Sequence, residues 1–227
     1  MSQDDIYKEI IQKEMAKLTK PVKLKVFTSK KSQPNGSFIR ECQECNTFMT
    51  LLKVYEANSN GMLTIEELSI YDDPEFAKKY DVERVPTILF IDNDGHEIIR
   101  YLAAPQGGEI QPFIQALFVF AGAPNYYKAT IKQNLDRIPP STIRVMLTNA
   151  CPYCPSVATV ANMFALASDG KIRTIIVDIM TNPDIGQYYD ASGVPYTIVN
   201  DNKTLVGMVG ANEIFKALIG GNINVQY

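Results

Sequence analysis

The sequence predicts an α/β protein made of two similar units in tandem, each a central mixed β-sheet flanked by helices. One motif pattern occurs twice along the 227 residues, and within each copy apolar positions alternate between strand and helix spacing. Cys42-Gln-Glu-Cys45 recurs as Cys151-Pro-Tyr-Cys154, a shift of 109 residues. The same shift superimposes Val85-Pro86 on Val194-Pro195, so each of these prolines lies 44 residues after the first cysteine of its copy.

Each copy opens with a helix and then a strand. The apolar spacing predicts helices over 6–18 and 127–138 and strands over 22–28 and 142–148. The two strands are offset by about 120 residues rather than 109, so the first copy carries about 11 extra residues within Ser29 to Glu41. This insert contains Pro34-Asn35-Gly36, a turn signature, and several charges, which together predict an exposed loop.

The rest of each copy follows one order: a helix after the cysteines, a strand, a short helix, two strands and a last helix. Apolar residues at helical spacing after each cysteine pair commit one helix face to a core. The later elements are predicted as strands over 63–70, 87–91, 97–102, 172–179, 196–199 and 204–209, short helices after Pro74 and Pro183, and helices over 110–120 and 212–219. With a linker near residues 121–124, the predicted domains are 1–121 and 122–227.

The charge and composition of the chain argue against several classes of function. A formal net charge of -3 argues against a nucleic-acid surface, and the mild cluster of Lys23, Lys25, Lys30 and Lys31 fits a solvated face. No apolar run is long enough to span a bilayer, and the acidic N-terminus lacks a leader for export, so a cytoplasmic location is expected. In a cytosolic protein, cysteines spaced this way are more often catalytic or metal-binding than structural.

The repeated cysteine pairs suit thiol–disulfide exchange. This chemistry needs an accessible thiolate and a second thiol that releases the mixed disulfide. The helix dipole stabilises the thiolate of a first cysteine at a helix N-terminus. Two intervening residues place the second cysteine about one helical turn further along the chain. Cys42 and Cys151 are therefore the predicted nucleophiles, and Cys45 and Cys154 the predicted resolving thiols.

The two pairs are expected to differ in reactivity. Glu44 places a negative charge near Cys42, and like charges disfavour ionisation of the thiol. Arg40, Lys30 and Lys31 could offset this charge, depending on how the insert folds. Pro152 and Tyr153 are uncharged, so nothing local opposes the Cys151 thiolate. We therefore expect the second pair to be the more reactive and the more oxidising.

The two valine-proline pairs are candidates for cis peptide bonds and for substrate binding. A cis bond before Pro86 or Pro195 would lock a turn. It would also leave the backbone of Val85 or Val194 free to pair with an extended substrate chain.

A Cys-x-x-Cys after a strand and a Val-Pro before a later strand resemble the thioredoxin fold, and Cys151-Pro-Tyr-Cys154 is similar to a glutaredoxin active site. The whole chain resembles the protein disulfide oxidoreductases of thermophilic archaea and bacteria. That resemblance implies a cytoplasmic protein of a thermophile with two redox-active domains and disulfide reductase, oxidase and isomerase activities. It also implies client proteins with disulfides, electrons from an NADPH-dependent flavoprotein of the thioredoxin-reductase type, and no bound cofactor.

The chain also departs from these families. The buried acid that thioredoxins carry six residues before the first cysteine is replaced by Val145 in the second copy and falls at Gly36 in the first. Proton transfer from the resolving thiol must then use another group or water. Gly107-Gly108 is a poor match to the glycine turn through which glutaredoxins bind glutathione, so glutathione is not expected as the reductant.

Two alternatives remain open at this level. The four cysteines could gather into one tetrahedral zinc site, although that arrangement gives the Val-Pro pairs no role and no metal is expected. The chain could also be a binding or chaperone module whose first domain is redox-inert or auxiliary. The direction of the reaction, the clients and the oligomeric state do not follow from the residues, because reductases, oxidases and isomerases share them.

Overall fold

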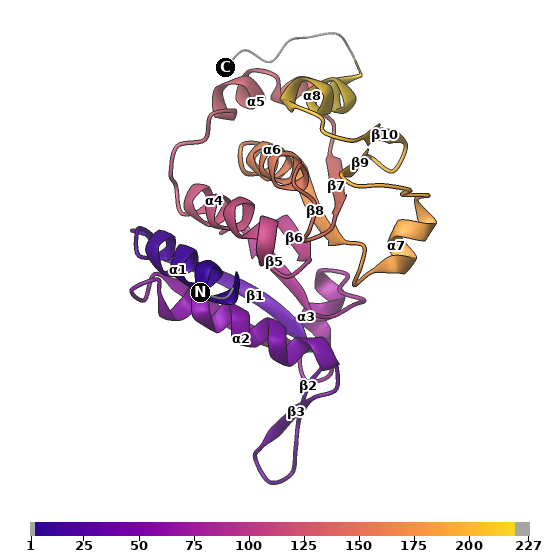
Figure 1. The fold of residues 1–227 in the computed structure, drawn as a ribbon. Helices are drawn as coiled ribbons and strands as arrows, with labels where there is room; N and C mark the ends of the chain where they lie inside the picture. The colour runs from indigo at the N-terminus through magenta and orange to yellow at the C-terminus, as the bar shows by residue number, and fades with distance from the viewer. Residues whose placement is uncertain (1–2, 221–227) are drawn as a thin grey trace. The chain divides into compact units, whose positions relative to one another are not determined.

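The structure is a computed structural model that describes residues 3–220, so residues 1–2 and 221–227 of the two predicted domains lie outside the described part. The chain folds into two compact units, residues 1–97 and 98–227 (Figure 1). In each unit a mixed sheet is flanked by helices, as the sequence predicts.

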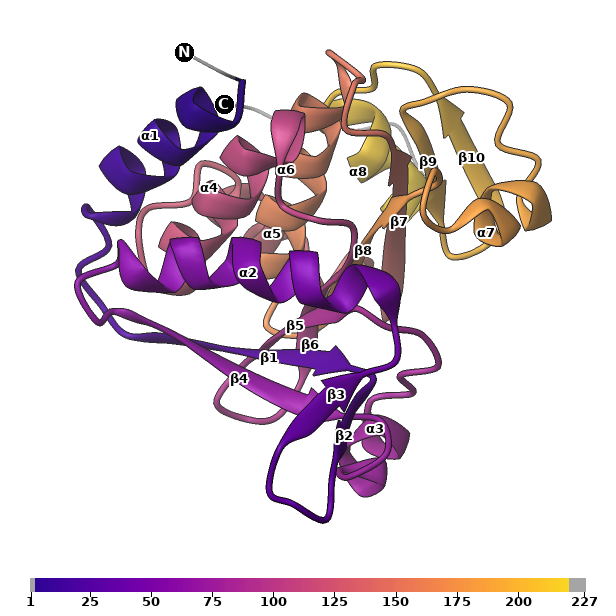
Figure 2. The same ribbon diagram turned by 60° about the horizontal axis from the view of Figure 1, so that its bottom comes forward.

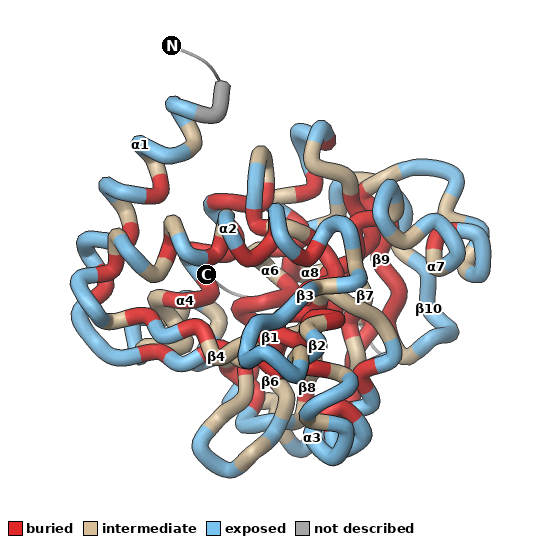
Figure 3. Tube along the Cα trace, turned by 90° about the horizontal axis from the view of Figure 1, so that it is seen from below, coloured by how far each residue is buried: buried red, intermediate tan, exposed pale blue. Residues whose placement is uncertain are grey.

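The first unit is built on three strands in the order β5-β1-β4. β1 (Val22–Thr28) pairs in parallel with β4 (Leu63–Ser69) and antiparallel with β5 (Thr87–Ile91). Alternation along β1 buries Leu24 and Val26 on one face and Phe27 on the other, so both faces need a cover. Figure 3 shows buried residues along β1, and buried and exposed positions alternating along α1 and α2.

Helices cover the sheet of the first unit on both faces. α1 (Gln3–Met15) packs against α2 (Gln43–Ala57), which crosses β4 (Figure 2). The short helix α3 (Pro74–Lys79) joins the opposite cluster, in which Ala77 packs with Phe27 and Leu89. α1 begins three residues before its predicted start and ends three residues before its predicted end.

The insert of the first copy is a β-hairpin and not the irregular loop that its turn signature predicted. β2 (Lys30–Ser32) and β3 (Phe38–Arg40) pair antiparallel around a turn in which Gly36 has a φ of 82°. The prediction of exposure is confirmed, because Phe38 is 48% and Ile39 50% exposed. Figure 1 shows the hairpin extending away from the sheet of its unit.

Strand register also corrects the length of the insert. Val22 pairs with Leu63, and Ser141 pairs with Ile172, so the first strands are offset by 119 residues. Fourteen residue steps separate the end of β1 from Cys42 and four separate the end of β7 from Cys151, which makes the insert ten residues long. In this register the counterpart of Val145 is Val26 rather than Gly36, and both valines are fully buried.

The second unit carries five strands in the order β10-β9-β7-β8-β6. β8 (Ile172–Asp178) pairs in parallel with both β6 (Glu97–Leu102) and β7 (Ser141–Leu147). β9 (Tyr196–Val199) runs antiparallel to β7 and to β10 (Lys203–Val206). β10 ends at Val206, three residues before its predicted end and directly before Gly207, which has a φ of 80°.

The helices of the second unit again lie on both faces of its sheet. α6 (Cys154–Leu166) packs on β7 and β8, and α4 (Ile110–Phe120) packs on α6. α8 (Ala211–Ile219) packs on β9 and β10, while α7 (Pro183–Tyr188) contributes Ile185 to the opposite face. The helix predicted over 127–138 is instead a short α5 (Lys128–Gln133) followed by a 3-10 turn, η2 (Leu135–Arg137).

The packing boundary lies at residues 97–98, whereas the repeat places its boundary near residue 121. The segment between them holds β6, the 3-10 turn η1 (Gly107–Glu109) and α4. This segment belongs to the first copy of the repeat by its order in the sequence, but it packs within the second unit. α4 is apolar on nearly every side, and such a helix needs cover all round. The predicted domain bounds 1–121 and 122–227 describe the two copies of the repeat, and they stay a prediction.

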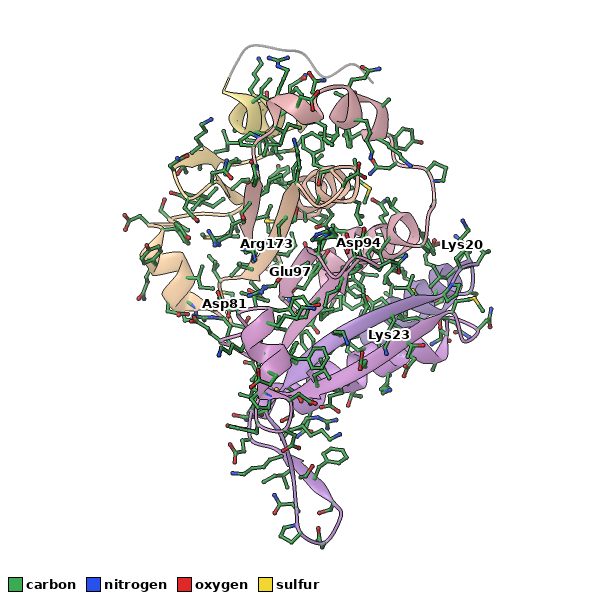
Figure 4. The ribbon with its side chains drawn as sticks, turned by 180° about the vertical axis from the view of Figure 1, so that it is seen from behind. Lys20, Lys23, Asp81, Asp94, Glu97 and Arg173 are labelled. Atoms are coloured by element: carbon green, nitrogen blue, oxygen red, sulfur yellow. A yellow bond between two sulfur atoms is a disulfide. The ribbon has the colours of Figure 1, made fainter. Side chains whose placement is uncertain are left out.

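Surface charge gives no concentrated basic patch in the described part of the first unit. Lys23 and Lys25 both pair with Glu66 on β4, and Lys31 pairs with Glu41. Figure 4 shows Lys20 and Lys23 toward the start of β1, away from the hairpin that carries Lys31. Among the helices formed by the described residues, none combines the length and apolar character needed to cross a membrane.

Candidate active sites

The first dithiol lies where the hairpin insert meets α2. Cys42 is the N-cap of α2, with extended backbone angles of φ -72° and ψ 119°, and its thiol is partly exposed. Cys45 is fully buried one turn on, and its backbone N–H donates to the Cys42 carbonyl at 3.2 Å. The thiol of Cys42 is thus the more accessible of the two, and the roles of Cys42 as nucleophile and Cys45 as resolving thiol stay predictions.

The predicted substrate-binding residues of the first unit lie at this dithiol. The Val85-Pro86 peptide bond is cis, as is the Val194-Pro195 bond in the second unit. The Cys42 thiol donates to the Val85 carbonyl oxygen at 3.7 Å. Substrate binding by the four Val-Pro residues stays a prediction, although Val85 is in direct contact with the nucleophile.

The second dithiol is a disulfide between Cys151 and Cys154. Cys154 is fully buried, Cys151 is 8% exposed, and the Cys154 backbone N–H donates to Cys151 Sγ at 3.1 Å. α6 begins at Cys154, so Cys151 precedes the helix by three residues instead of starting it. Pro152 and Tyr153 form the exposed rim, and the Tyr153 side chain is 57% exposed.

Residues 141–220 match a protein family described as the thioredoxin domain. A probable thioredoxin from Methanothermobacter marburgensis is 30% identical over 76 residues, which are 34% of this chain and 89% of that protein. The chain belongs to the thioredoxin family. Membership and two Cys-x-x-Cys pairs identify an oxidoreductase, and they confirm the resemblance to protein disulfide oxidoreductases drawn from the sequence.

Two solved structures share the fold of this thioredoxin-family chain over nearly its whole length. A protein disulfide oxidoreductase from Aeropyrum pernix K1 superimposes with a TM-score of 0.81 at 24% identity, covering 99% of this chain and 97% of that one. A mutant of the alkylhydroperoxide reductase AhpF from Enterococcus faecalis superimposes with a TM-score of 0.75 at 21% identity, covering 95% and 98%. The predicted tandem thioredoxin fold is thereby confirmed.

One functional candidate was missed from the sequence. Glu109 is 1% exposed, and neither carboxylate oxygen has a hydrogen-bond partner among the described residues. Burial raises its pKa to about 8, and the charge of Asp178 contributes to the rise. Glutamate at the start of a helix is ordinary on an exposed surface, so the sequence offered no sign that this one is buried.

The turn that carries Glu109 packs closely against the second cysteine motif. η1 packs against α6. A Cβ added at Gly108 would lie 3.1 Å from Pro155 Cγ and 3.7 Å from the Cys151 carbonyl oxygen, and one at Gly107 would lie 3.1 Å from the Asn149 carbonyl oxygen. Gly107 and Gly108 are therefore needed for close approach to the cysteine motif.

Asp178 and Asn149 complete the polar surroundings of the second dithiol. Asn149 Nδ2 donates to Asp178 Oδ2 at 3.3 Å, and Met180 N–H donates to Asp178 Oδ1 at 2.9 Å. Asp178 ends β8 and is 3% exposed. The charge of Asp178 adds to burial in raising the pKa of Glu109.

The first dithiol has different surroundings. Glu44, expected to tune Cys42, lies exposed in the first turn of α2. Burial and the adjacent Cys42 thiol raise the pKa of Cys45 to about 12, although hydrogen bonds from Ser29 act to lower it. A charged pair, Arg40 and Glu67, lies on the strands beside this site.

One other cluster could hold a cation by its geometry alone. Asp92, Asp94 and His96 bring one ligand atom each to within 4.8 Å of one another. Asp92 Oδ1 already accepts from the backbone N–H groups of Asp94 and His96, at 3.0 and 2.7 Å. The His96 ring lies 3.2 Å from the other Asp92 oxygen. These contacts describe a polar turn, as the sequence predicts.

Proposed function

We propose that the protein catalyses thiol–disulfide exchange on protein disulfides, at both dithiols, through a mixed disulfide. The observation that carries this proposal is the repeated arrangement of a Cys-x-x-Cys at the start of a helix and a cis Val-Pro in the same unit. We further propose a cytoplasmic protein of a thermophile that receives electrons from an NADPH-dependent, thioredoxin-reductase-like flavoprotein. Glutathione has no part in this proposal.

The spacing of Cys151 and Cys154 at the start of α6 supports the following reaction at the second site. The Cys151 thiolate attacks one sulfur of a client disulfide, that S–S bond breaks, and a mixed disulfide forms while one client thiolate leaves. Cys154 then loses its proton and attacks Cys151 Sγ, which releases the second client thiolate. Two electrons pass from the dithiol to the client, and Cys151–Cys154 becomes a disulfide.

We propose Glu109 as the base that accepts the proton of the Cys154 thiol. Cys154 is fully buried and must deprotonate away from water. A carboxyl group without hydrogen-bond partners among the described residues, on a turn that packs against α6, exchanges its proton near neutral pH when its pKa is about 8. It fills the role left empty by Val145.

Dithiothreitol-driven reduction of insulin disulfides tests the proposal. We compare the wild type with Cys42→Ser, Cys151→Ser and the double variant. Because Glu44 lies near Cys42 and no charge lies next to Cys151 in the motif, we expect the larger loss in Cys151→Ser and no activity in the double variant. Equal losses would remove the expected asymmetry. An inactive wild type would instead favour a binding module.

A further inference from the structure

The hairpin insert brings an arginine to the first dithiol. Arg40 is the last residue of β3, and its side chain is 15% exposed. Its Nε and Nη2 donate to the two carboxylate oxygens of Glu67 at 2.6 and 2.7 Å. Nη1 donates at 2.9 Å to Oδ1 of Asn46, the residue that follows Cys45 on α2. The planar guanidinium is therefore fixed against the cysteine motif.

Glu67 is held in place from the sheet. Thr28 Oγ1, at the end of β1, donates to Glu67 Oε1 at 2.6 Å. Burial opposes ionisation of Glu67, but hydrogen bonds from Arg40 and Thr28 outweigh it and lower its pKa. The pKa of Arg40 is raised by the hydrogen bond to Glu67, and the charges of Glu67 and of a Cys45 thiolate add to this. Arg40 thus stays charged within electrostatic range of Cys45.

The other end of the insert also touches the dithiol. Ser29 is 3% exposed, and its hydroxyl oxygen accepts the Cys42 backbone N–H at 2.5 Å. The same hydroxyl donates to Cys45 Sγ at 3.9 Å. Ser29, at one end of the insert, therefore contacts the resolving cysteine, and Arg40, near the other end, contacts the neighbouring Asn46. In the second copy only three residues separate β7 from Cys151, and none of them is charged.

We propose that the insert stabilises the Cys45 thiolate, with Ser29 donating a hydrogen bond to its sulfur and Arg40 acting as a positioning residue that supplies positive charge beside it. The inference rests on the proposed function, because it requires Cys42 and Cys45 to cycle between dithiol and disulfide. During reduction an external thiolate attacks Cys42 Sγ, and the Cys42–Cys45 bond breaks. Its electron pair stays on Cys45 Sγ, which leaves as a thiolate and later takes a proton. A better stabilised thiolate leaves faster.

The test isolates the first dithiol in the full chain by Cys151→Ser and Cys154→Ser. Oxidised protein is reduced with dithiothreitol at pH 7, quenched with acid, and its free thiols are counted by mass after maleimide labelling. Arg40→Met and Ser29→Ala are each expected to slow reduction roughly three- to tenfold, because each removes one stabilising interaction with the leaving sulfur.

Glu67→Gln is expected to act in the opposite direction. It removes the negative charge that neutralises Arg40, while Asn46 still holds the guanidinium, so reduction becomes faster. Arg40→Lys keeps the charge and is expected to stay within about twofold of the parent rate. Lys31→Gln is the matched control: it removes one positive charge from the same hairpin, at a side chain that bonds Glu41, and leaves the rate unchanged.

The outcomes separate the inference from the proposed function. Slower reduction in both Arg40→Met and Glu67→Gln would mean that the ion pair is only structural, and would overturn the inference. Unchanged rates in Arg40→Met and Ser29→Ala would overturn it too, while leaving a competent dithiol. If the parent forms no dithiothreitol-reducible Cys42–Cys45 disulfide, both the inference and the first-site half of the proposed function fail.

Discussion

The side chain of Glu109 is buried, and its protonation makes the stability of the second unit depend on pH. Its ordinary pKa of 4.5 rises to about 8 in the folded chain. Between these values the folded state holds a proton that the unfolded state has released. The free energy of unfolding therefore falls as pH rises through this window, by at most about 1.4 kcal/mol per pH unit.

Glu109→Gln removes this titration while keeping the shape of the side chain. We expect the variant to match the wild type near pH 5 and to be more stable near pH 8, because the wild type alone bears the growing cost of a buried negative charge. Urea unfolding followed by circular dichroism at several pH values measures the difference. Glu83→Gln, at an exposed position, is the control. Parallel pH profiles for wild type and Glu109→Gln would contradict the assignment.

The rate of the reaction gives a second test of the role of Glu109. If Glu109 accepts the Cys154 proton, Glu109→Gln slows release of the mixed disulfide, although it stabilises the fold near pH 8. We expect the mixed disulfide between Cys151 and a client to accumulate in stopped reactions, as it does when Cys154 itself is removed. A variant that turns over at the wild-type rate without accumulation would exclude this role.

At the scale of elements, α4 links the fold to the second active site. Its residues Phe113, Ile114 and Leu117 are at most 1% exposed, and Phe113 packs edge-on against Tyr101 with ring centroids 5.3 Å apart. α4 follows directly on η1, so its docking on α6 also fixes Glu109 beside the cysteine motif. The hairpin β2–β3 plays the corresponding part in the first unit by carrying Arg40.

Phe113→Ala is expected to lower the free energy of unfolding by about 3–5 kcal/mol, because it opens a cavity where α4 meets its own unit. Gln115→Ala, on the exposed face of the same helix, should change it by less than about 0.5 kcal/mol. Denaturant unfolding measures both. A loss in Phe113→Ala no larger than that in Gln115→Ala would mean that α4 is not docked as described.

At the scale of the whole molecule, the copies of the repeat and the packed units do not coincide. β6, η1 and α4 follow the first motif in the sequence, yet β6 pairs with β8 and α4 packs on α6. The second dithiol therefore has part of its surroundings built from the end of the first copy. The burial of an almost wholly apolar helix favours this packing of α4 on α6.

Two fragments test which boundary matters for folding. A fragment of residues 98–227 keeps β6, Glu109 and α4, and we expect it to unfold cooperatively. A fragment of residues 122–227 exposes the side of α6 that α4 covers, so we expect it to aggregate or unfold without a cooperative transition. Circular dichroism during heating distinguishes them. Equal cooperative stability would show that the repeat boundary is also the folding boundary.

Much of this organisation could be read from the sequence. Strand and helix periodicity predicted the order of the elements, and the two motifs predicted that each cysteine pair lies between a strand and a helix. The cis bonds before Pro86 and Pro195 were also predicted. The predictions that were wrong concern segments with weak periodicity. The hairpin in the insert has strands of only three residues, and the predicted helix at 127–138 is interrupted.

The sequence by itself determined the thioredoxin-like units and their dithiols, because local periodicity and a spacing repeated at 109 residues are properties of the chain. Only the tertiary structure decided what surrounds each dithiol. Whether Glu109 is solvated or buried, and whether Arg40 reaches Glu67, depends on side chains brought together across a fold. Desolvation and charge pairing depend on these distances in space, and spacing along the sequence does not contain them.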